Sequence, residues 1–235
     1  MQAVIVAGGE GVRLRPFTYA IPKPLLPVGD KTVVECTLAL LKDCGFTEVI
    51  VVVNYKPEQF LDFFEKWEKE NANNFKITIF IEKQKLGTAG SLSLIKDQLK
   101  DTFCVINGDL LVRAPLLELM NFHIKSESDL TTSIKQYEYK VPYAVVDFDN
   151  DKHLTSLAEK PSYYHKINTG IYAMSHRALQ YLPHDKYFDM PSLIEKLIRN
   201  DRRVKVFDIG AQWLDMGQIL DYERAIEIIA EWDKI

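Results

Sequence analysis

Apolar runs and helical patterns alternate through the first half of this chain. Four short apolar or β-branched runs, the composition of strands buried on both faces of a parallel sheet, lie at residues 2–7, 49–53, 75–81 and 103–106. Between the first two, Val34, Leu38 and Leu41 recur at helical spacing after a capping box of Thr32 and Glu35. Further helical patterns begin at Pro57 and cover residues 89–99. This βαβαβαβ order predicts right-handed crossovers and an open parallel sheet.

The second half has the spacing of hairpins. Strand patterns lie at residues 128–137, 144–148, 153–157 and 168–174, and Asp149-Asn150-Asp151 predicts a tight turn. Helical patterns return at 190–199 and 219–232. No proline- or glycine-rich linker separates the halves. We therefore expect an α/β fold: one Rossmann-like domain over residues 1–235, with a mostly parallel central sheet, helices on both faces and a β-hairpin region.

Composition excludes several classes of protein. The 235 residues are 47% hydrophobic and 26% charged, so the chain can bury a large core and disorder is excluded. A net charge of −4 without a basic run argues against nucleic acid as a partner. Residues 1–7 do not form a signal peptide, no apolar span suits a membrane, and three unpaired-looking cysteines fit a reducing compartment. These features predict a cytoplasmic protein and leave a homo-oligomer open.

The first strand runs into a glycine-rich turn, Ala7-Gly8-Gly9-Glu10-Gly11. Such a turn brings backbone N–H groups close to an anion, and Arg13, Arg15 and Lys23 follow closely, which favours a polyphosphate. Leu14 stands where a dinucleotide-binding G-x-G-x-x-G needs its third glycine, and no Gly-Lys-Ser/Thr follows for a P-loop. The sequence therefore predicts a phosphate loop of a third kind.

Two carboxylates are candidate ligands of a divalent cation. Asp109 ends a strand in Asn107-Gly108-Asp109, where ligands of parallel sheets bind. Asp215 lies much later, in Trp213-Leu214-Asp215-Met216-Gly217. Oxygen ligands on a phosphate favour Mg²⁺, although Asp109 could also be a turn residue and Asp215 a helix cap. The sequence does not show whether the two carboxylates meet.

Two further segments carry polar groups suited to a base and a sugar phosphate. Leu86-Gly87-Thr88-Ala89-Gly90 follows Glu82, with Thr88 as an expected N-cap. The small residues would let a flat base approach, and Glu82 could accept from guanine N1–H and N2–H₂. Glu159 and Lys160 suit sugar hydroxyls and a phosphate, although such a lysine is often a solvated surface group. Pro161 predicts extended backbone at Lys160.

The motifs together resemble the sugar nucleotidyltransferases, or nucleotide-sugar pyrophosphorylases. The resemblance spans nearly the whole chain and rests on Gly8–Leu14, Pro22–Val28, Leu86–Gly90, Asn107–Asp109, Glu159–Pro161, Asn168–Tyr172 and Trp213–Gly217. It implies that a nucleoside monophosphate is transferred from an NTP to a sugar-1-phosphate, with Mg²⁺ as cofactor. It also implies a nucleotide-binding half, 1–110, and a sugar-phosphate-binding half, 111–235.

The resemblance assigns roles to single residues. Arg13 and Lys23 would hold the phosphates of the NTP, Lys160 the sugar phosphate, and Asp109 and Asp215 the Mg²⁺. The remaining nucleotide-binding residues would be Ala7, Gly8, Gly9, Gly11, Glu82, Gly87, Thr88 and Asn107, besides Asp109. The sugar would contact Tyr143, Ala144, Glu159, Lys160 and Asn168. Two residues depart from the family pattern: Ala144 stands where glycine is usual, and Val12 where threonine or serine is common.

Leu86–Gly90 resembles the guanylyltransferase branch, which makes GTP the expected donor. Residues 141–146 and 188–193 are similar to the glucosamine-1-phosphate guanylyltransferases that begin GDP-sugar routes to legionaminic acid. A uridylyl-, thymidylyl- or cytidylyltransferase remains an alternative. A non-catalytic nucleotide-sugar sensor is disfavoured, because the basic and acidic groups are all present. A glycosyltransferase is excluded, because the Asp147-Phe148-Asp149 pattern falls in a predicted hairpin turn.

Overall fold

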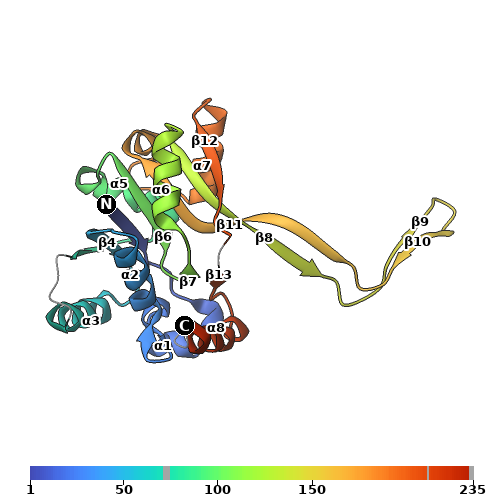
Figure 1. The fold of residues 1–235 in the computed structure, drawn as a ribbon, viewed down its shortest axis with the longest axis horizontal. Coiled ribbons are helices and arrows are strands. Elements are labelled where there is room, and N and C mark those ends of the chain that lie inside the picture. Colours follow the sequence, from blue (N-terminus) through green and yellow to red (C-terminus); the bar gives the residue numbers. More distant parts are fainter. Residues whose placement is uncertain (71–74, 211, 233–235) are drawn as a thin grey trace.

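Seven strands form the central sheet, in the order β12-β8-β11-β6-β1-β4-β5 (Figure 1). Residues 1–70, 75–210 and 212–232 are described in this computed structural model. The strands are β1 (Gln2–Val6), β4 (Glu48–Val53), β5 (Lys76–Ile81), β6 (Thr102–Asn107), β8 (Leu130–Lys140), β11 (Ser162–Ser175) and β12 (Val204–Asp208). All neighbouring pairs are parallel except those of β11, which runs antiparallel to β6 and β8. The predicted α/β fold with a mostly parallel sheet is confirmed.

Helices cover both faces of this sheet, because alternate strand residues point to opposite sides. One core contains Ile5, Val51 and Ile106 and is closed by α2 (Val33–Asp43), α3 (Pro57–Glu70) and α6 (Leu116–Lys125). The other contains Val4, Val52 and Val105 and is closed by α4 (Gly87–Gly90), α5 (Leu92–Ile95) and α7 (Met190–Arg199). The prediction of helices on both faces is thereby confirmed.

Small elements bring the end of the chain back to the sheet. β7 (Leu110–Arg113) pairs antiparallel with β13 (Gln212–Asp215), so that Asp215 lies opposite Leu110. The following helix α8 (Ile219–Trp232) packs on the β2–β3 hairpin (Pro27–Val28 and Lys31–Thr32) through a third core that includes Val28 and Ile229. α1 (Phe17–Ala20), η1 (Val12–Leu14) and η2 (Lys23–Leu25) complete the segment after β1. Residues distant in sequence thus converge beside the carboxyl end of β6.

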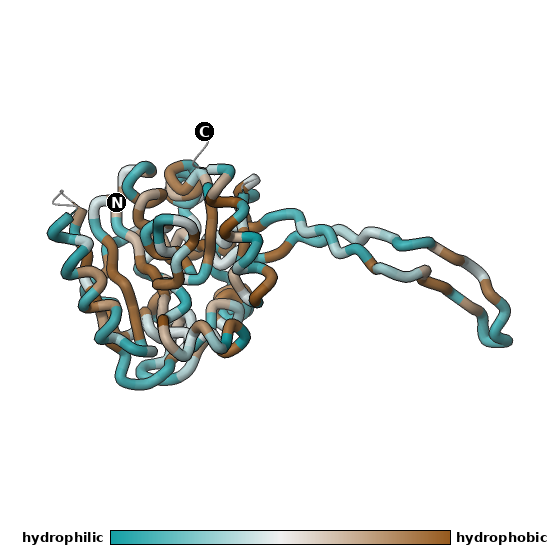
Figure 2. The backbone as a smooth tube through the Cα atoms, turned by 90° about the horizontal axis from the view of Figure 1, so that it is seen from below, coloured by the Kyte–Doolittle hydropathy of each residue, from teal (hydrophilic) through white to brown (hydrophobic). Residues whose placement is uncertain are grey.

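A long two-stranded arm leaves the body of the molecule (Figures 1 and 2). β8 and β11 stay paired along the arm, from the pair of Ile134 with Asn168 to the pair of Lys140 with Ser162. The hairpin of β9 (Val145–Phe148) and β10 (Leu154–Ala158) continues at the far end. We call residues 135–167 the arm. Because β11 is antiparallel to β6, the arm leaves from the edge of the sheet where β6 ends.

Most predicted elements are present with small shifts in their bounds. The capping box of Thr32 and Glu35 is confirmed, and so are the helices at 190–199 and 219–232. The continuous helix predicted over 89–99 is wrong, because the segment divides into α4, α5 and η3 (Lys96–Gln98). Its first turn is held by a tertiary contact, since Ala89 and Gly90 both donate backbone N–H groups to the Phe188 carbonyl. β11 begins at Ser162, six residues earlier than the strand predicted at 168.

The helices of the described part of the chain do not include one that is long and apolar enough to cross a membrane.

Candidate active site

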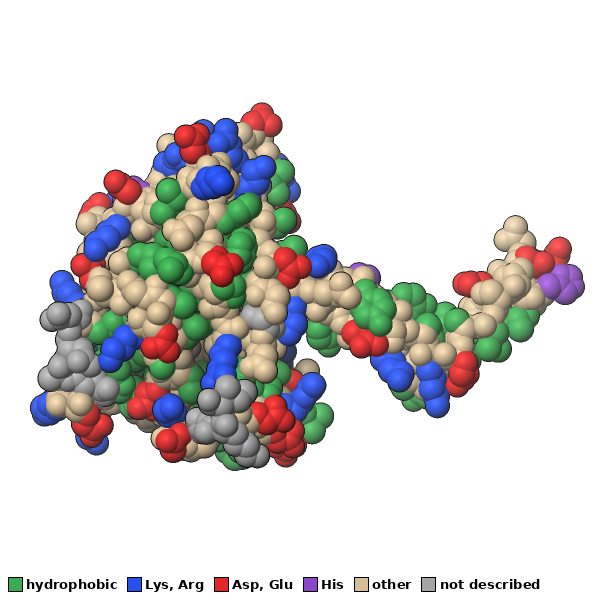
Figure 3. All heavy atoms as spheres, viewed as in Figure 1, with side chains coloured by type: hydrophobic (Ala, Val, Ile, Leu, Met, Phe, Trp, Pro, Cys, Tyr) green, Lys and Arg blue, Asp and Glu red, His purple; other side chains and the backbone are tan. Residues whose placement is uncertain are grey.

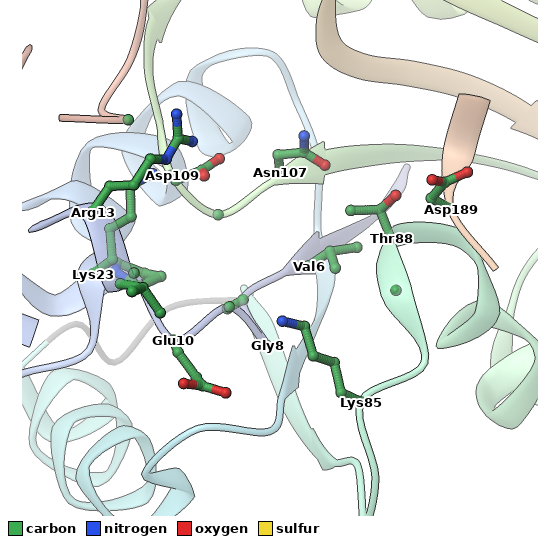
Figure 4. A pocket seen from close by; sticks show the side chains of 18 of the residues that line it. Val6, Gly8, Glu10, Arg13, Lys23, Lys85, Thr88, Asn107, Asp109 and Asp189 are labelled. Atoms are coloured by element: carbon green, nitrogen blue, oxygen red, sulfur yellow. Dashed lines mark hydrogen bonds and ion pairs between the residues drawn. The ribbon is translucent and has the colours of Figure 1, made fainter. Parts of the chain in front are cut away.

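A pocket opens where β1 and β6 end, at the edge of the sheet where parallel α/β folds bind ligands (Figure 4). The glycine-rich turn forms one side, and the turn that leads into α4 forms the other. Every residue predicted to bind the nucleotide lines this pocket, together with both basic residues of the first segment: Ala7, Gly8, Gly9, Gly11, Arg13, Lys23, Glu82, Gly87, Thr88, Asn107 and Asp109.

The glycine-rich turn presents bare backbone to the pocket. Gly11 has a φ of 61°, and a Cβ there would lie 2.7 Å from Thr18 Cγ2. The Thr18 hydroxyl also donates to the Gly11 carbonyl at 2.8 Å, which fixes the turn. A Cβ at Gly9 would meet no heavy atom within 4 Å, so this position faces open space. The turn therefore needs glycine at Gly11 for its shape, whereas Gly9 leaves room for a ligand.

Asp109 and Asp215 meet around the ammonium of Lys23. Antiparallel pairing of β7 and β13 brings them together, and Met216 N–H donates to the Asp109 carbonyl at 3.1 Å. Lys23 Nζ lies 2.7 Å from Asp109 Oδ2 and 3.6 Å from Asp215 Oδ1, and Lys23 itself is buried. Arg13 is close by, its guanidinium nitrogens 3.4 Å from the position of a Cβ on Gly217. The question that the sequence left open is thus answered: the two carboxylates share one place.

The carboxyl of Asp215 is poorly compensated in this arrangement. Its Oδ1 is buried and has no hydrogen-bond partner among the described residues. Burial raises the pKa of Asp215, and the neighbouring charge of Asp109 raises it further, while Lys23 and Arg13 act in the opposite direction. The helix-cap role considered for Asp215 belongs to Asp221, whose carboxyl accepts from Gln218 N–H at 2.9 Å at the start of α8. Asp215 is therefore an acceptor in need of a cation.

Glu82 forms the floor of the pocket beneath Gly8. Its side chain is buried, and Oε2 lies 3.1 Å from where a Cβ on Gly8 would be. Burial raises the pKa of Glu82 to about 7, and its Oε1 has no hydrogen-bond partner among the described residues. A buried carboxyl without partners is costly unless a ligand donates to it. The geometry thus marks Glu82 as an acceptor for a bound molecule.

The turn into α4 is shaped by the segment before α7. Gly87 has a φ of 80°, and a Cβ on it would lie 2.7 Å from the Phe188 carbonyl oxygen. The Thr88 hydroxyl accepts from Met190 N–H at 2.9 Å, and the N-cap position of α4 is Leu86. The expectation that Thr88 caps its own helix is therefore wrong, because its hydroxyl is used in this long-range contact.

Sequence reasoning missed three polar side chains of the pocket: Lys85, Tyr187 and Asp189. Lys85 extends toward Gly8 from the side opposite Arg13 (Figure 4). No role in the site was predicted for Asp189, which caps α7 by accepting from Ser192 N–H at 2.9 Å. These side chains reach the pocket because the turn before α4 packs on residues 186–189. No pattern of neighbouring residues in the sequence predicts this long-range packing.

Asn168 lies at the sheet edge next to the pocket. Its Oδ1 accepts from Gly170 N–H at 2.9 Å, and Gly170 has a φ of 78°. A Cβ on Gly170 would lie 2.6 Å from Asn107 Nδ2, so this part of β11 presses against a pocket residue. Asn168 thus lies close to Asn107 through Gly170, but it is not among the described residues that line the pocket.

The other residues assigned to the sugar lie far from the pocket. Tyr143, Ala144, Glu159 and Lys160 are all exposed on the arm, outside the set of described residues that lines the pocket. Lys160 has a φ of 47°, so the prediction of extended backbone there is wrong. It lies in the connection between β10 and β11. The structure thus assembles the nucleotide side of the predicted site but not its acceptor side.

Comparison with known proteins agrees with this geometry. The chain matches the family described as Nucleotidyl transferase over residues 2–231. It is 36% identical to a mannose-1-phosphate guanyltransferase of Schizosaccharomyces pombe, over 94% of this chain and 62% of that protein. A probable mannose-1-phosphate guanylyltransferase 1 of Oryza sativa subsp. japonica is 34% identical, over 97% and 64%. The chain thus spans less than two thirds of the length of these relatives.

A solved structure aligns with nearly all of the chain. HddC from Yersinia pseudotuberculosis aligns with a TM-score of 0.76 and 30% identity, over 97% of this chain and 99% of that one. The same protein has also been crystallised in complex with GMP-PN, and this structure aligns with a TM-score of 0.76 and 29% identity over the same shares of the two chains. The fold is thus similar to that of a protein crystallised with GMP-PN.

Proposed function

The chain belongs to the nucleotidyl transferase family, and from this premise we propose that it transfers GMP from GTP to a sugar-1-phosphate and releases pyrophosphate. The observation that carries the proposal is the convergence of the glycine-rich turn, Arg13, Lys23, Asp109 and Asp215 at one pocket. Relatives named for mannose-1-phosphate guanylyl transfer support the same reaction class. We further propose that residues 1–235 act as one nucleotidyltransferase domain in the cytoplasm.

The glycine-rich turn and two cations would hold the triphosphate. Gly9 leaves the backbone bare where a phosphate oxygen can approach. Arg13 and Lys23 stand on the same side of the pocket and supply positive charge for the phosphates, in particular as pyrophosphate leaves. Lys85 faces them across the pocket and adds a third cation that sequence reasoning did not include.

Asp109 and Asp215 fit a divalent cation, which we propose is Mg²⁺. Oδ1 of Asp215 is buried, accepts no hydrogen bond from the described residues and lies 3.6 Å from its ion-pair partner Lys23 Nζ, so it is available as an oxygen ligand of a hard cation. The described residues offer no group of three or more acidic, histidine or cysteine side chains, which suits a cation that takes its other ligands from phosphate and water. When bound, the cation would neutralise phosphate charge.

Glu82 would select guanine. Its carboxylate can accept two hydrogen bonds from the N1–H and N2–H₂ edge of guanine, whereas uracil and thymine offer one donor between two acceptors. Glu82 lines the pocket, and its buried Oε1 has no hydrogen-bond partner among the described residues, so it has a free acceptor for such a donor. The guanine nucleotide analogue bound by HddC supports this choice of base.

The reaction needs no general base. A phosphate oxygen of the sugar-1-phosphate is already anionic and attacks the α-phosphorus of GTP, while the bond from that phosphorus to the β-phosphate oxygen breaks and its electron pair leaves with pyrophosphate. Rate acceleration then comes from orientation and charge neutralisation. We assign the α-, β- and γ-phosphates to Arg13 and Lys23, and the acceptor phosphate to Lys160.

Release of pyrophosphate over a matrix of nucleoside triphosphates and hexose-1-phosphates tests this proposal. GTP with glucosamine-1-phosphate or mannose-1-phosphate is expected to react fastest. Glu82→Gln serves as the matched variant, because it keeps the shape but replaces one acceptor by a donor, and its preference for GTP should fall at least tenfold. Equal rates with UTP, dTTP or CTP in the wild type would reassign the base, and no release with any pair would refute the transferase.

A further inference from the structure

Most of the tyrosines in the paired strands of the arm lie on one face. Residues directly opposite in an antiparallel pair point to the same side, and Tyr163 pairs with Tyr139 and His165 with Tyr137. Three tyrosines, Tyr137, Tyr139 and Tyr163, therefore share one face, whereas the other face carries Gln136, Glu138 and Lys166 and a single tyrosine, Tyr164. Such alternation is typical of a ribbon with one face buried. In this chain, however, the three tyrosines are 43% to 55% exposed.

The outer hairpin shows the same excess of uncovered apolar surface. Its exposed large apolar side chains are Tyr143, Val146, Phe148, Leu154 and Leu157. Figure 3 shows hydrophobic side chains on the surface of the arm. A two-stranded ribbon alone is at best marginally stable in water, so these side chains need a partner surface. The arm also carries Glu159 and Lys160, which the proposed reaction requires near the pocket.

The arm cannot reach its own pocket by swinging at its root. Trp213 Nε1 donates to the Thr169 carbonyl at 2.8 Å, and Ser133 Oγ, buried like Thr169, donates to the Ile171 carbonyl at 2.8 Å. Ile209 N–H donates to the Ile134 carbonyl at 3.0 Å. The Lys166–Asp208 ion pair, at 2.6 Å, adds a tie to β12.

These hydrogen bonds and this ion pair fix the direction of the ribbon where it leaves the sheet. From the pair of Ile134 with Asn168 to the pair of Lys140 with Ser162, the strands continue without a register shift. At about 3.3 Å per residue, Lys160 lies about 25 Å along the strand from Asn168. The acceptor side of the pocket is therefore left without the arm of its own chain.

We propose that two copies of this chain exchange arms, so that Glu159 and Lys160 of one copy complete the pocket of the other. This inference rests on the proposed function for the role of these two residues, but the exchange itself rests on the arm. Each pocket offers uncovered apolar surface to receive it, since Val12 and Tyr187 line the pocket and are 53% and 63% exposed. The arm also supplies a number of residues comparable with the roughly 20–30 that a standard interface uses on each side. Reciprocal exchange is isologous and closes at a dimer.

Complementation between two defective variants tests the exchange. Arg13→Ala disables the body of one copy and Lys160→Ala the arm of another, and each homodimer should lose nearly all turnover. The two variants are co-expressed with different tags and the heterodimer is isolated on both tags. It has one site with an intact body and an intact arm, so it should recover about half of wild-type turnover.

The double variant Arg13→Ala/Lys160→Ala provides the matched control. In its heterodimer with wild type, every site receives one defective part, so turnover should fall close to zero. If instead the Arg13→Ala/Lys160→Ala heterodimer with wild type keeps half of the activity while the complementing heterodimer stays inactive, the arm serves its own chain and the proposal is overturned.

Sedimentation gives a readout that does not depend on activity. The wild-type chain should sediment as a dimer, and Tyr137→Ser/Tyr139→Ser/Tyr163→Ser should sediment as a monomer with a folded body by circular dichroism. The control on the other face, Gln136→Ser/Glu138→Ser, should remain dimeric. A monomeric wild type, or a tyrosine variant that stays dimeric, contradicts the exchange. If wild type releases no pyrophosphate with any substrate, the proposed function fails and sedimentation alone decides the exchange.

Discussion

The ammonium of Lys23 donates to Oδ2 of Asp109 at 2.7 Å, although the two residues are 86 positions apart in the chain. The same ammonium lies 3.6 Å from Oδ1 of Asp215. One buried cation thus lies between two carboxylates, which follow β6 and end β13, and leaves them a net negative charge. This triad joins the glycine-rich segment to the last third of the chain and defines where charge is concentrated in the pocket.

Replacing Lys23 should remove most of the turnover. In Lys23→Ala, the two carboxylates face each other and the triphosphate without a compensating cation, and kcat should fall by about 100-fold or more. The measurement is steady-state pyrophosphate release with GTP. Lys125→Ala, an exposed lysine at the end of α6, is the matched control and should keep wild-type rates. A kcat of Lys23→Ala within threefold of the wild-type value would show that Lys23 is not needed for turnover.

Asp215→Asn should weaken the response to Mg²⁺. The amide keeps the size of the side chain but lacks the charge that its buried Oδ1 would offer to a cation. We expect the Mg²⁺ concentration for half-maximal rate to rise at least tenfold, and chelation to abolish turnover in wild type and variant alike. The test is a Mg²⁺ titration of initial rates at saturating GTP. Asp221→Asn, at the start of α8, is a nearby acidic control and should leave the Mg²⁺ titration unchanged.

The raised pKa of Glu82 makes stability depend on pH in a defined window. Because the pKa is raised from 4.5 to about 7 on folding, the contribution of Glu82 to stability is fully present below about pH 4.5 and is lost as pH rises through about 7. Glu82→Gln removes this loss. At pH 8 the ligand-free variant should unfold at higher urea concentration than wild type, by roughly 2 to 3 kcal/mol in free energy of unfolding.

The two curves should approach each other near pH 5, where Glu82 is protonated in the folded chain. Urea unfolding at several pH values between 5 and 8 checks this. A difference that does not vary across that range would show that Glu82 ionises normally in the folded protein.

Two glycines of the turn should respond differently to alanine. Gly11→Ala places a Cβ 2.7 Å from Thr18 Cγ2 at a φ of 61° and should cost about 1 to 3 kcal/mol of stability. Gly9→Ala meets no heavy atom within 4 Å, so its melting temperature should stay close to wild type while the KM for GTP rises several-fold. Thermal unfolding and initial rates measure both effects. The pattern fails if Gly9→Ala proves the less stable of the two.

Local patterns predicted most of the fold. The capping box of Thr32 and Glu35 predicted the start of α2, and the apolar spacing predicted the bounds of α7 and α8. Both succeeded because caps and periodicity are properties of neighbouring residues. The segment 162–167 was missed as a strand because its polar and aromatic residues become a strand only through pairing with β8. α6 and the short strands β7, β12 and β13 were not predicted either.

The site divides in the same way. Gly8–Gly11 and Asp109 follow strands that sequence could locate, and together with Lys23, at the start of η2, they line one pocket. The meeting of Asp109 with Asp215, and the arrival of Lys85 and Asp189, depend on long-range packing and had no local signal. The position of Lys160 on an extended arm depends on the direction in which β8 and β11 leave the sheet, which sequence spacing does not encode.

The transfer of label from GTP tests the central claim most directly. With α-³²P-labelled GTP, a hexose-1-phosphate and Mg²⁺, the account predicts that label enters a GDP-sugar, whereas label in the γ-position is released as pyrophosphate. Arg13→Ala should suppress both outcomes together. Label from the γ-position in inorganic phosphate or in the sugar, with none from the α-position in a nucleotide sugar, would contradict the account.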